Sequence, residues 1–410
     1  MNRRDITSLF SLDHVDHYEL LKLFDVEFKT SWRYSTTEIA FPAQHDHLLL
    51  VRWDDDEIKA ITKGRKLKQE SIDRLIRLVQ SNLIGQAPDE FGADVLLAGC
   101  PVPAGFRCDS IPLQILPPPD HAPRPPWISA DHPFVLEFPL PRCELPELRF
   151  QRRSRRATEW ARALNVFLPT RIQFQGPRIR QCWGMSIDEH HECRWVQQQY
   201  AYEPFNIFSP ALSGGVPQLK SIPFSRTNSD IKAQFQAGRP IDELWIPNDL
   251  TPNLEAFAAL QRRDRIRFLR AATAIYAAND AWETSVSSHL IACVQAIEAL
   301  SEPVRSPPRR CRWHPFRKNP EPTAAFRAVC ERYAPAELAT KRVLNALYDL
   351  RSDIAHGRRF FYLDELPWSS GGSLSLLVSG DLDASNVVVQ LATAVAINWM
   401  RDRTAAVAAL

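Results

Sequence analysis

An arginine and a histidine close a predicted helix near the C-terminal end of the sequence. Residues 347–357 read LYDLRSDIAHG, in which Arg351 precedes His356 by five positions. A histidine side chain exchanges protons near neutral pH, and an arginine can hold a phosphate through two parallel hydrogen bonds. The pair therefore suits cleavage of a phosphodiester bond without a metal ion. The alternative is a cationic pair that only complements the dipole of the helix.

The helix that carries this pair is predicted from its apolar positions. They recur at i, i+4, i+7 and i+11, which is the period of one helix face, and they are Val343, Leu347, Leu350 and Ile354. Residues 334–337 contain a proline followed by an acid and are predicted to open the helix. Gly357 is predicted to end it, because glycine tolerates the left-handed backbone that follows a helix.

Arg351 and His356 do not share a face of this helix. Residues five positions apart project about 140° apart, whereas Ser352 and Asp353 lie beneath His356 and are assigned auxiliary roles. A site that uses both Arg351 and His356 is easiest to build where this helix end meets another one. The same helix end in a second subunit would serve.

A second predicted helix supplies an acid for Arg351. Its apolar stripe is regular and consists of Val286, Leu290, Cys293, Ile297 and Leu300. Glu298 lies beside this stripe, and a buried carboxylate requires a cation. Arg351 is the predicted partner, which would fix the direction of its guanidinium. The preceding helix has a less regular stripe, which consists of Ile266, Leu269, Thr273 and Tyr276.

These two stretches resemble the HEPN family. Residues 347–357 are similar to its R-x(4–6)-H signature, in particular to the ApeA-like HEPN branch linked to anti-phage defence. Residues 288–300 resemble its earlier helix, with an acid inside an apolar run, and the resemblance covers roughly residues 255–400. The family often has Asn, Asp or His directly after the arginine, whereas this sequence has Ser352 there and its acid at Asp353.

The resemblance implies a helical bundle that forms a homodimer, with the arginine and histidine of both subunits lining one cleft. It also implies metal-independent attack by a ribose 2′-hydroxyl on the adjacent phosphate. His356 would act as general base or acid, Arg351 would stabilise the phosphorane, and Glu298 would support Arg351. The expected function is an endoribonuclease in anti-phage defence. The alternative is a catalytically silent HEPN module that dimerises, binds RNA and serves as a scaffold or regulator.

Basic residues alternate with aromatic ones in the stretch between the predicted helices, residues 304–318. Such a mixture can hold a phosphate backbone and stack on bases. The residues predicted to bind RNA are Arg309, Arg310, Arg312, Trp313 and Lys318, together with Arg358 and Arg359 just after the motif. The alternative is a solvated loop anchored by its aromatic side chains. A further basic cluster, residues 152–156, is either a solvated face or a nucleic-acid contact.

Residues 1–250 mix short strands with helices. The predicted strands are residues 47–53, 94–98, 134–138, 166–168, 172–174 and 194–196, and the predicted helices are residues 70–83 and 158–164. A proline-rich segment, residues 115–128, is predicted to be a linker or surface loop between two subdomains. Long helical patterns follow. The sequence thus predicts an α+β protein, with a β-rich mixed region followed by a bundle of about five helices over residues 251–410.

The composition and the absence of certain motifs exclude other classes of protein. The 410 residues are 45% hydrophobic and 24% charged, with a net charge of +2, so any RNA-binding surface must be local in a soluble globular protein. We expect neither a signal peptide nor a membrane-spanning segment, and we find no glycine-rich phosphate loop or zinc-ligand spacing in the sequence. We expect a cytoplasmic protein without metal or cofactor. Its substrate would be RNA, and residues 1–250 would sense a phage-derived trigger or restrain the nuclease.

Overall fold

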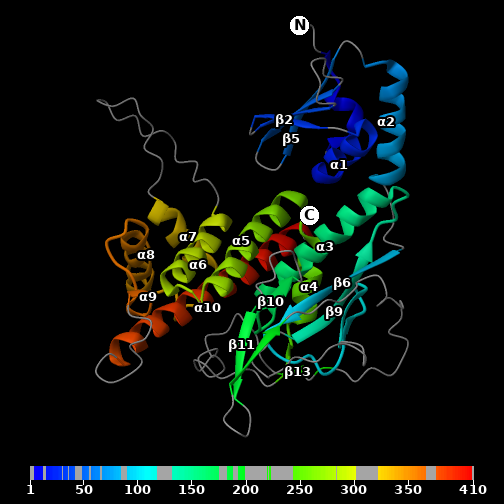
Figure 1. The fold of residues 1–410 in the computed structure, drawn as a ribbon. Coiled ribbons are helices and arrows are strands. Elements are labelled where there is room, and N and C mark those ends of the chain that lie inside the picture. The colour runs from blue at the N-terminus through cyan, green and yellow to red at the C-terminus, as the bar shows by residue number, and fades with distance from the viewer. Residues whose placement is uncertain are drawn as a thin grey trace, which may run out of the picture. The chain divides into compact units, whose positions relative to one another are not determined.

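The computed structural model describes most of the chain, and Figure 1 labels its elements. The described residues are 4–12, 15–29, 31–35, 37–41, 49–54, 57–64, 67–84, 90–117, 132–174, 182–187, 193–198, 219, 221–222, 243–282, 284–301, 322–365 and 375–408. Strands lie in the N-terminal part and helices in the C-terminal part, which confirms the predicted α+β class. The chain divides into two compact units, Met1–Asp94 with Glu137–Ala157 and Val95–Leu136 with Thr158–Leu410.

The first unit is built on an antiparallel sheet of five strands. Their order is β1, β5, β4, β3, β2, and their bounds are Arg4–Asp5, Glu57–Lys63, Leu49–Asp54, Glu38–Phe41 and Trp32–Ser35. The 3-10 helix η1 (Thr7–Phe10), α1 (His17–Phe28) and α2 (Gln69–Asn82) complete the unit. The Asp16 side chain accepts hydrogen bonds from two amides in the first turn of α1 and so caps that helix.

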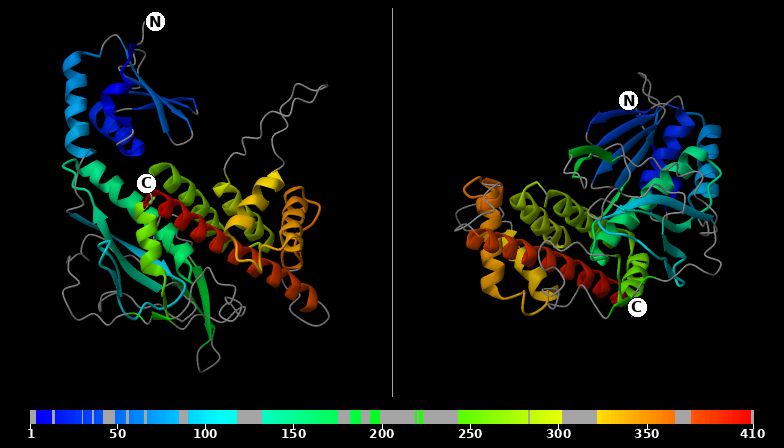
Figure 2. Two further views of the ribbon diagram at one scale, coloured as in Figure 1. Left: turned by 180° about the vertical axis from the view of Figure 1, so that it is seen from behind. Right: turned by 60° about the horizontal axis from the view of Figure 1, so that its bottom comes forward.

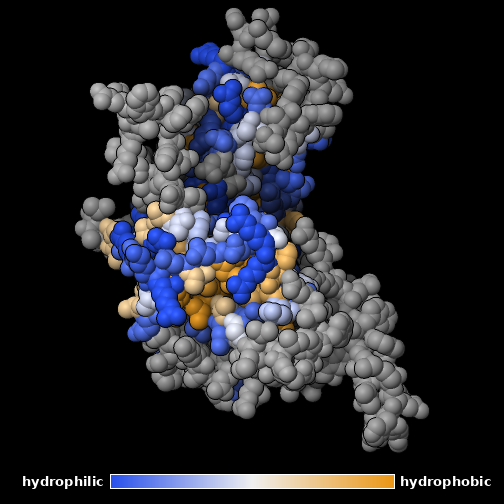
Figure 3. Space-filling view, turned by 90° about the vertical axis from the view of Figure 1, so that its left-hand side faces the viewer, coloured by the Kyte–Doolittle hydropathy of each residue, from blue (hydrophilic) through white to orange (hydrophobic). Residues whose placement is uncertain are grey.

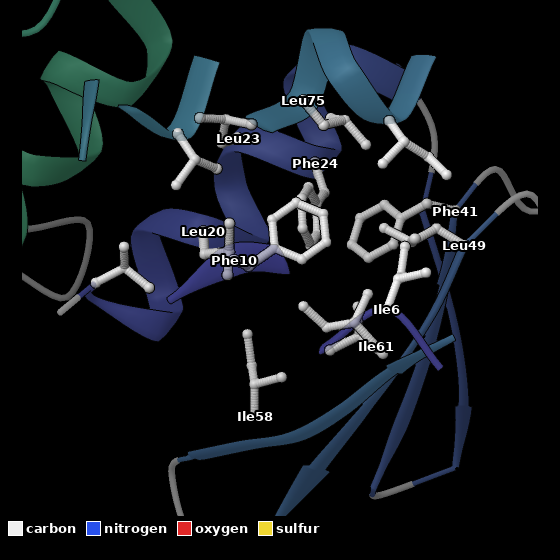
Figure 4. Packing of buried hydrophobic residues seen from close by; sticks show 14 of the residues in the cluster. Ile6, Phe10, Leu20, Leu23, Phe24, Phe41, Leu49, Ile58, Ile61 and Leu75 are labelled. Atoms are coloured by element: carbon white, nitrogen blue, oxygen red, sulfur yellow. The ribbon is translucent and has the colours of Figure 1, made fainter. Parts of the chain in front are cut away.

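Helices α1 and α2 pack over one face of this sheet through an apolar core (Figure 4). Phe24 of α1 lies edge-on to Phe10 and Phe41, with ring centroids 5.4 and 5.8 Å away. The buried apolar residues of α2 recur at helical spacing. The predicted helix at residues 70–83 is therefore confirmed, and so is the predicted strand at 47–53 over its described residues.

Helix α3 (Pro146–Phe167) begins in the first unit and ends in the second. Its Arg152 is 2% exposed, and the guanidinium donates twice to Glu19 Oε2. The same guanidinium donates to three backbone carbonyls, those of Asn82, Pro141 and Arg142. Arg155 pairs with Asp16. The prediction that residues 152–156 form a solvated or nucleic-acid-binding basic face is therefore wrong for Arg152 and Arg155. Both arginines instead bond to acids of the first unit, and Arg152 also bonds to backbone carbonyls there.

A second sheet of five strands has the order β10, β6, β9, β8, β7. Their bounds are Ile172–Phe174, Glu90–Ala98, His132–Leu140, Leu113–Leu116 and Phe106–Cys108. Two smaller pairs are the hairpin of β11 (Cys182–Ile187) with β12 (Cys193–Gln198) and the parallel pair of β13 (Ser221–Ile222) with β14 (Ile246–Pro247). The predicted strands 94–98, 134–138, 172–174 and 194–196 lie within β6, β9, β10 and β12. The predicted linker begins too early, because residues 115 and 116 end β8. Residues 118–128 of that segment lie outside the described residues.

The strand predicted at residues 166–168 is wrong. Residues 166 and 167 end α3, a helix of 22 residues that also contains the predicted short helix. This helix buries Trp160, Leu164 and Phe167 at helical spacing. Its Asn165 side chain also hydrogen-bonds both backbone groups of Ile172 in β10. Packing along one helix face therefore overrides the local preference of an apolar run for a strand.

Seven helices follow β14 in the described part of the chain. They are α4 (Leu250–Ala259), α5 (Arg262–Ala281), α6 (Val286–Leu300), α7 (Pro322–Tyr333), α8 (Lys341–Ala355), α9 (Tyr362–Glu365) and α10 (Ser375–Ala408). Helix α6 contacts α5, α7, α8, α9 and α10, and α10 also runs along α5 (Figure 2). The helical part is thus a bundle centred on α6. No helix in the described ranges combines the length and hydropathy needed to span a bilayer.

Candidate functional site

Helix α8, which carries Arg351, begins later than its sequence predicts. The Thr340 side chain accepts a hydrogen bond from the amide three residues on and caps the helix. Residues 335–339 form a separate turn, in which the Pro335 carbonyl accepts from the amides three and four residues later. The predicted opening at residues 334–337 is therefore wrong, because the proline begins a turn and the threonine begins the helix.

Helix α8 packs by one face against α6 and α7. Its buried residues are Leu344, Leu347, Tyr348 and Ile354. The predicted stripe is correct at Leu347 and Ile354, whereas Val343 and Leu350 are half-buried. The buried face turns toward Tyr348 because its ring packs on Phe326 of α7, with centroids 5.4 Å apart. Tyr348 thereby forms part of the floor on which Arg351 lies.

The end of α8 is fixed by backbone hydrogen bonds around Gly357. The Gly357 amide donates to the Ile354 carbonyl at 2.9 Å, and the Arg358 amide donates to the Asp353 carbonyl at 2.8 Å. This pair of bonds is a Schellman motif, which requires a left-handed residue, and Gly357 has a φ of 66°. The predicted role of Gly357 is confirmed. His356 is the first residue past the helix, and it is exposed.

Arg351 and Glu298 form the ion pair that the sequence predicts. Arg351 Nη2 lies 3.3 Å from Glu298 Oε2, and each side chain is 26% exposed. The guanidinium also lies over the Tyr348 ring, 5.8 Å from its centroid. Arg351 Nε is buried and has no hydrogen-bond partner among the described residues. Arginine has five N–H donors, so Glu298 and Tyr348 orient this guanidinium while most of its donors stay available.

Arg351 and His356 occupy different environments at the end of α8. No hydrogen bond joins them within the described residues, and they differ in environment, half-buried for Arg351 and exposed for His356. The predicted auxiliary residues Ser352 and Asp353 are half-buried on the last turn of α8. Asp353 lies 3.7 Å from Arg358, at the outer limit of an ion pair. The site formed with a second helix end stays a prediction.

Sequence reasoning missed how the segment after the motif is held. Both carboxylate oxygens of Asp364 accept hydrogen bonds at the N-terminus of α6, from the amides of Val286 and Ser287 at 2.7 and 2.9 Å. The Tyr362 amide donates to Asp381 of α10 at 2.7 Å. Burial raises the pKa of the Asp381 carboxyl above its ordinary value. Two acids therefore tie the chain beyond His356 to two other helices.

Several predicted site residues cannot be placed. Arg309, Arg310, Arg312, Trp313 and Lys318, predicted to bind RNA, lie outside the described residues. Their role stays a prediction. Arg358 and Arg359, by contrast, are described and exposed directly beyond Gly357.

Within the described ranges, no group of three or more His, Cys, Asp or Glu side chains is arranged to hold a metal ion. Burial raises the pKa of Cys330 to about 12, so this thiol of α7 keeps its proton. Comparison of the chain with protein-family models, curated proteins and solved structures gave no match.

Proposed function

We propose that residues 251–410 form a HEPN-type endoribonuclease domain that acts in anti-phage defence, and that residues 1–250 sense a phage-derived trigger or restrain it. We place the reaction in the cytoplasm, a compartment that keeps thiols such as those of Cys293 and Cys330 reduced. The observation that carries the proposal concerns Arg351, which donates a single hydrogen bond, to Glu298, and lies five residues before a histidine at the exposed end of its helix. Helix packing alone requires neither a partly unpaired guanidinium at Arg351 nor an exposed imidazole at His356.

Arg351 suits the binding of a phosphate. The contact with Glu298 uses one of the five donors of the guanidinium, and the Nη1 donors have no partner among the described residues. A phosphate that approaches Arg351 can therefore take two parallel hydrogen bonds, which are stronger and more directional than those of an ammonium group. In this role Arg351 would stabilise the charge that develops on the phosphorane, and Glu298 would be its positioning residue.

His356 suits the transfer of a proton. Its side chain is exposed at the end of α8, where a substrate can reach it. In the proposed reaction a ribose 2′-oxygen attacks the adjacent phosphorus while the bond to the 5′-oxygen breaks. The products are a 2′,3′-cyclic phosphate and a 5′-hydroxyl. The 2′-oxygen loses a proton and the 5′-oxygen gains one, and His356 mediates one of these transfers.

The complete site would need two subunits. No hydrogen bond joins Arg351 and His356 among the described residues, and on one helix they project about 140° apart, so a homodimer through the helical bundle would best supply a cleft that contains both. Light scattering of the purified chain should then give the mass of a dimer at micromolar concentration. A monomer that retains cleavage would contradict this part of the proposal.

The test of the chemistry is cleavage of single-stranded RNA of mixed sequence, with EDTA present. His356→Ala should lower the rate by about 10²–10⁴-fold, the usual contribution of a general acid or base. Arg351→Lys should also be poorly active, because lysine keeps the charge but not the planar fork. Arg342→Lys is the matched control, since Arg342 is exposed on the first turn of the same helix. It should cleave like the unmodified chain.

A substrate with one 2′-deoxyribose on the 5′ side of the cut should survive at that position. If this substrate is still cut, if EDTA stops cleavage, or if His356→Ala is fully active, the mechanism is wrong. An unmodified chain that binds RNA but does not cleave it, with or without extract of phage-infected cells, would favour the silent scaffold instead.

A further inference from the structure

The segment that follows α8 exposes two aromatic rings beside two arginines. Arg358, Arg359, Phe360 and Tyr362, termed the aromatic–basic strip, are all exposed. Phe360 is 46% and Tyr362 38% exposed, and they are two of six large hydrophobic residues with such exposure in the described ranges. Figure 3 looks at the helical part from the side on which α8 and α9 lie in Figure 1, and hydrophobic residues border strongly hydrophilic ones there.

The segment that carries these exposed rings is held in place by hydrogen bonds of its backbone. Phe361, between them, is buried, and its amide donates to Ser287 Oγ of α6 at 3.0 Å. The next amide, that of Tyr362, donates to the buried carboxylate of Asp381. Asp364 then holds the start of α6 through both of its oxygens. The backbone is thus anchored on each side of Tyr362 and directly after Phe360, so both rings are presented to solvent from a fixed support.

The two arginines of the strip are only weakly engaged. Arg358 reaches Asp353 at 3.7 Å, and the Arg358 side chain is 69% exposed. Arg359 is exposed, and within the described ranges its one recorded interaction is electrostatic, with Asp381. Single exposed hydrophobic residues are ordinary on protein surfaces. Two rings and two available guanidinium groups within five residues are the combination that binds unpaired nucleotides, since rings stack on bases and guanidinium groups hold phosphates.

We propose that the aromatic–basic strip binds single-stranded RNA, with Phe360 and Tyr362 stacked on unpaired bases and the two arginines on flanking phosphates. The inference rests on the proposed function in one respect, that the strand so held continues past His356. It adds a substrate class, because the bases of an RNA duplex are stacked on one another and its deep major groove excludes side chains. The strip therefore selects unpaired RNA over duplex RNA.

The test measures binding without cleavage. The probe is a short, unpaired 2′-O-methyl oligoribonucleotide, which has no free 2′-hydroxyl, and its competitor is the same strand annealed to its complement. The full chain should bind the single strand at least about tenfold more tightly than the duplex. Phe360→Ala and Tyr362→Ala should each weaken binding of the single strand by about 5- to 150-fold, the range for a ring stacked on a base. Phe360→Trp should restore it.

The matched control is Phe150→Ala. Phe150 is 59% exposed and also lies beside an arginine, Arg153, 5.4 Å from its ring centroid, but it belongs to α3. Its substitution should leave binding unchanged. Arg358→Gln with Arg359→Gln should lower the slope of log affinity against log salt by about 0.7 for each phosphate that the strip no longer neutralises. Thermal unfolding should be the same for all of these exposed positions.

The outcomes separate this inference from the proposed function. Equal binding of single strand and duplex, or full binding by the Phe360→Ala, Tyr362→Ala double variant, would overturn the inference even if RNA is cleaved. A double variant that becomes monomeric but keeps its RNA affinity would also overturn it, because the strip would then be an interface between two copies. Loss of binding in the double variant, in a chain that never cleaves RNA, would support the strip and reject the nuclease.

Discussion

The first compact unit and the helical part of the second unit each pair an arginine with a glutamate. In the first unit, Arg152 makes five hydrogen bonds, two to Glu19 and three to backbone carbonyls, and it is buried. In the helices, Arg351 makes one hydrogen bond, to Glu298, and remains partly exposed. A guanidinium has five N–H groups. All of them are used at Arg152, whereas most of those at Arg351 have no partner among the described residues.

This difference separates an arginine that holds a fold together from one that can hold a ligand. A buried ion pair is tolerable only when further hydrogen bonds satisfy its remaining donors and lone pairs. Arg152 meets that condition by joining α3 to α1 and to the segments at Asn82 and Pro141. Arg351 meets only part of it. The charge of the two residues is identical, so the number of nearby acceptors is what tells them apart.

The largest expected effect is a loss of stability when the buried Arg152–Glu19 pair is broken. Arg152→Ala leaves the carboxylate of Glu19 buried without a cation and three carbonyls without a donor. It should lower the free energy of unfolding by about 3–5 kcal/mol. Arg351→Ala, the same change at the partly exposed pair with Glu298, should lower the free energy of unfolding by no more than about 1 kcal/mol. Urea denaturation of both variants measures this, and equal midpoints would break the comparison.

A smaller effect is expected where the strip is anchored. Asp364→Ala removes a carboxylate that accepts from two amides in the first turn of α6. The loss of this cap should cost about 1–2 kcal/mol, and RNA affinity should fall with it because the strip loses a support. Asp349→Ala on α8 is the control, since Asp349 is exposed. Urea denaturation and oligonucleotide binding of the two variants distinguish an anchor from a surface charge.

The smallest effect extends the comparison to histidine. His289 is buried, its Nδ1 lies 2.9 Å from the Ala278 carbonyl, and burial lowers its pKa. As pH falls below about 6.5, His289 is protonated in the unfolded chain but stays neutral in the folded chain, so the free energy of unfolding falls. His289→Gln should show a smaller loss between pH about 7.5 and about 5.5 in urea denaturation. An unchanged pH dependence in this variant would show that other groups control it.

Helix α6 shows what the sequence predicts well. Its five-residue stripe is buried throughout, and Glu298 beside the stripe does meet Arg351. The stripe is easy to recognise because α6 is central and is covered by several helices, so apolar residues recur without interruption. The ion pair is predictable because a carboxylate on such a helix needs a cation, and the motif offers one.

Helix α5 shows where the same reasoning fails. Its predicted stripe is half-buried, and the buried residues are Phe268, Ala271, Ala272, Ile275 and Ala278. The reason is Arg162 of α3, which bonds Thr273 and lies over the Tyr276 ring, 5.9 Å from its centroid. An arginine from a distant part of the chain thus covers the face that periodicity assigns to the core. Small alanines mark the true packing face and carry little hydrophobic signal.

The anchors of the strip could not be predicted for a similar reason. Ser285 caps α6 from the adjacent position in the sequence, since its hydroxyl accepts a hydrogen bond from an amide three residues on. Asp364 bonds the same helix end from 78 residues away, and nothing local to it indicates that contact. Only the fold brings the two segments together.

The path of the chain through the turn at Gly357 does not depend on which side chains flank the glycine. Both hydrogen bonds that end α8 run between backbone atoms, and the one strict requirement is a residue that tolerates a positive φ. The residues on either side of the glycine, His356 and the two arginines, therefore project from a frame that does not depend on them. Such a frame lets a lineage, or an engineer, exchange one recognition residue for another while the helix end keeps its position.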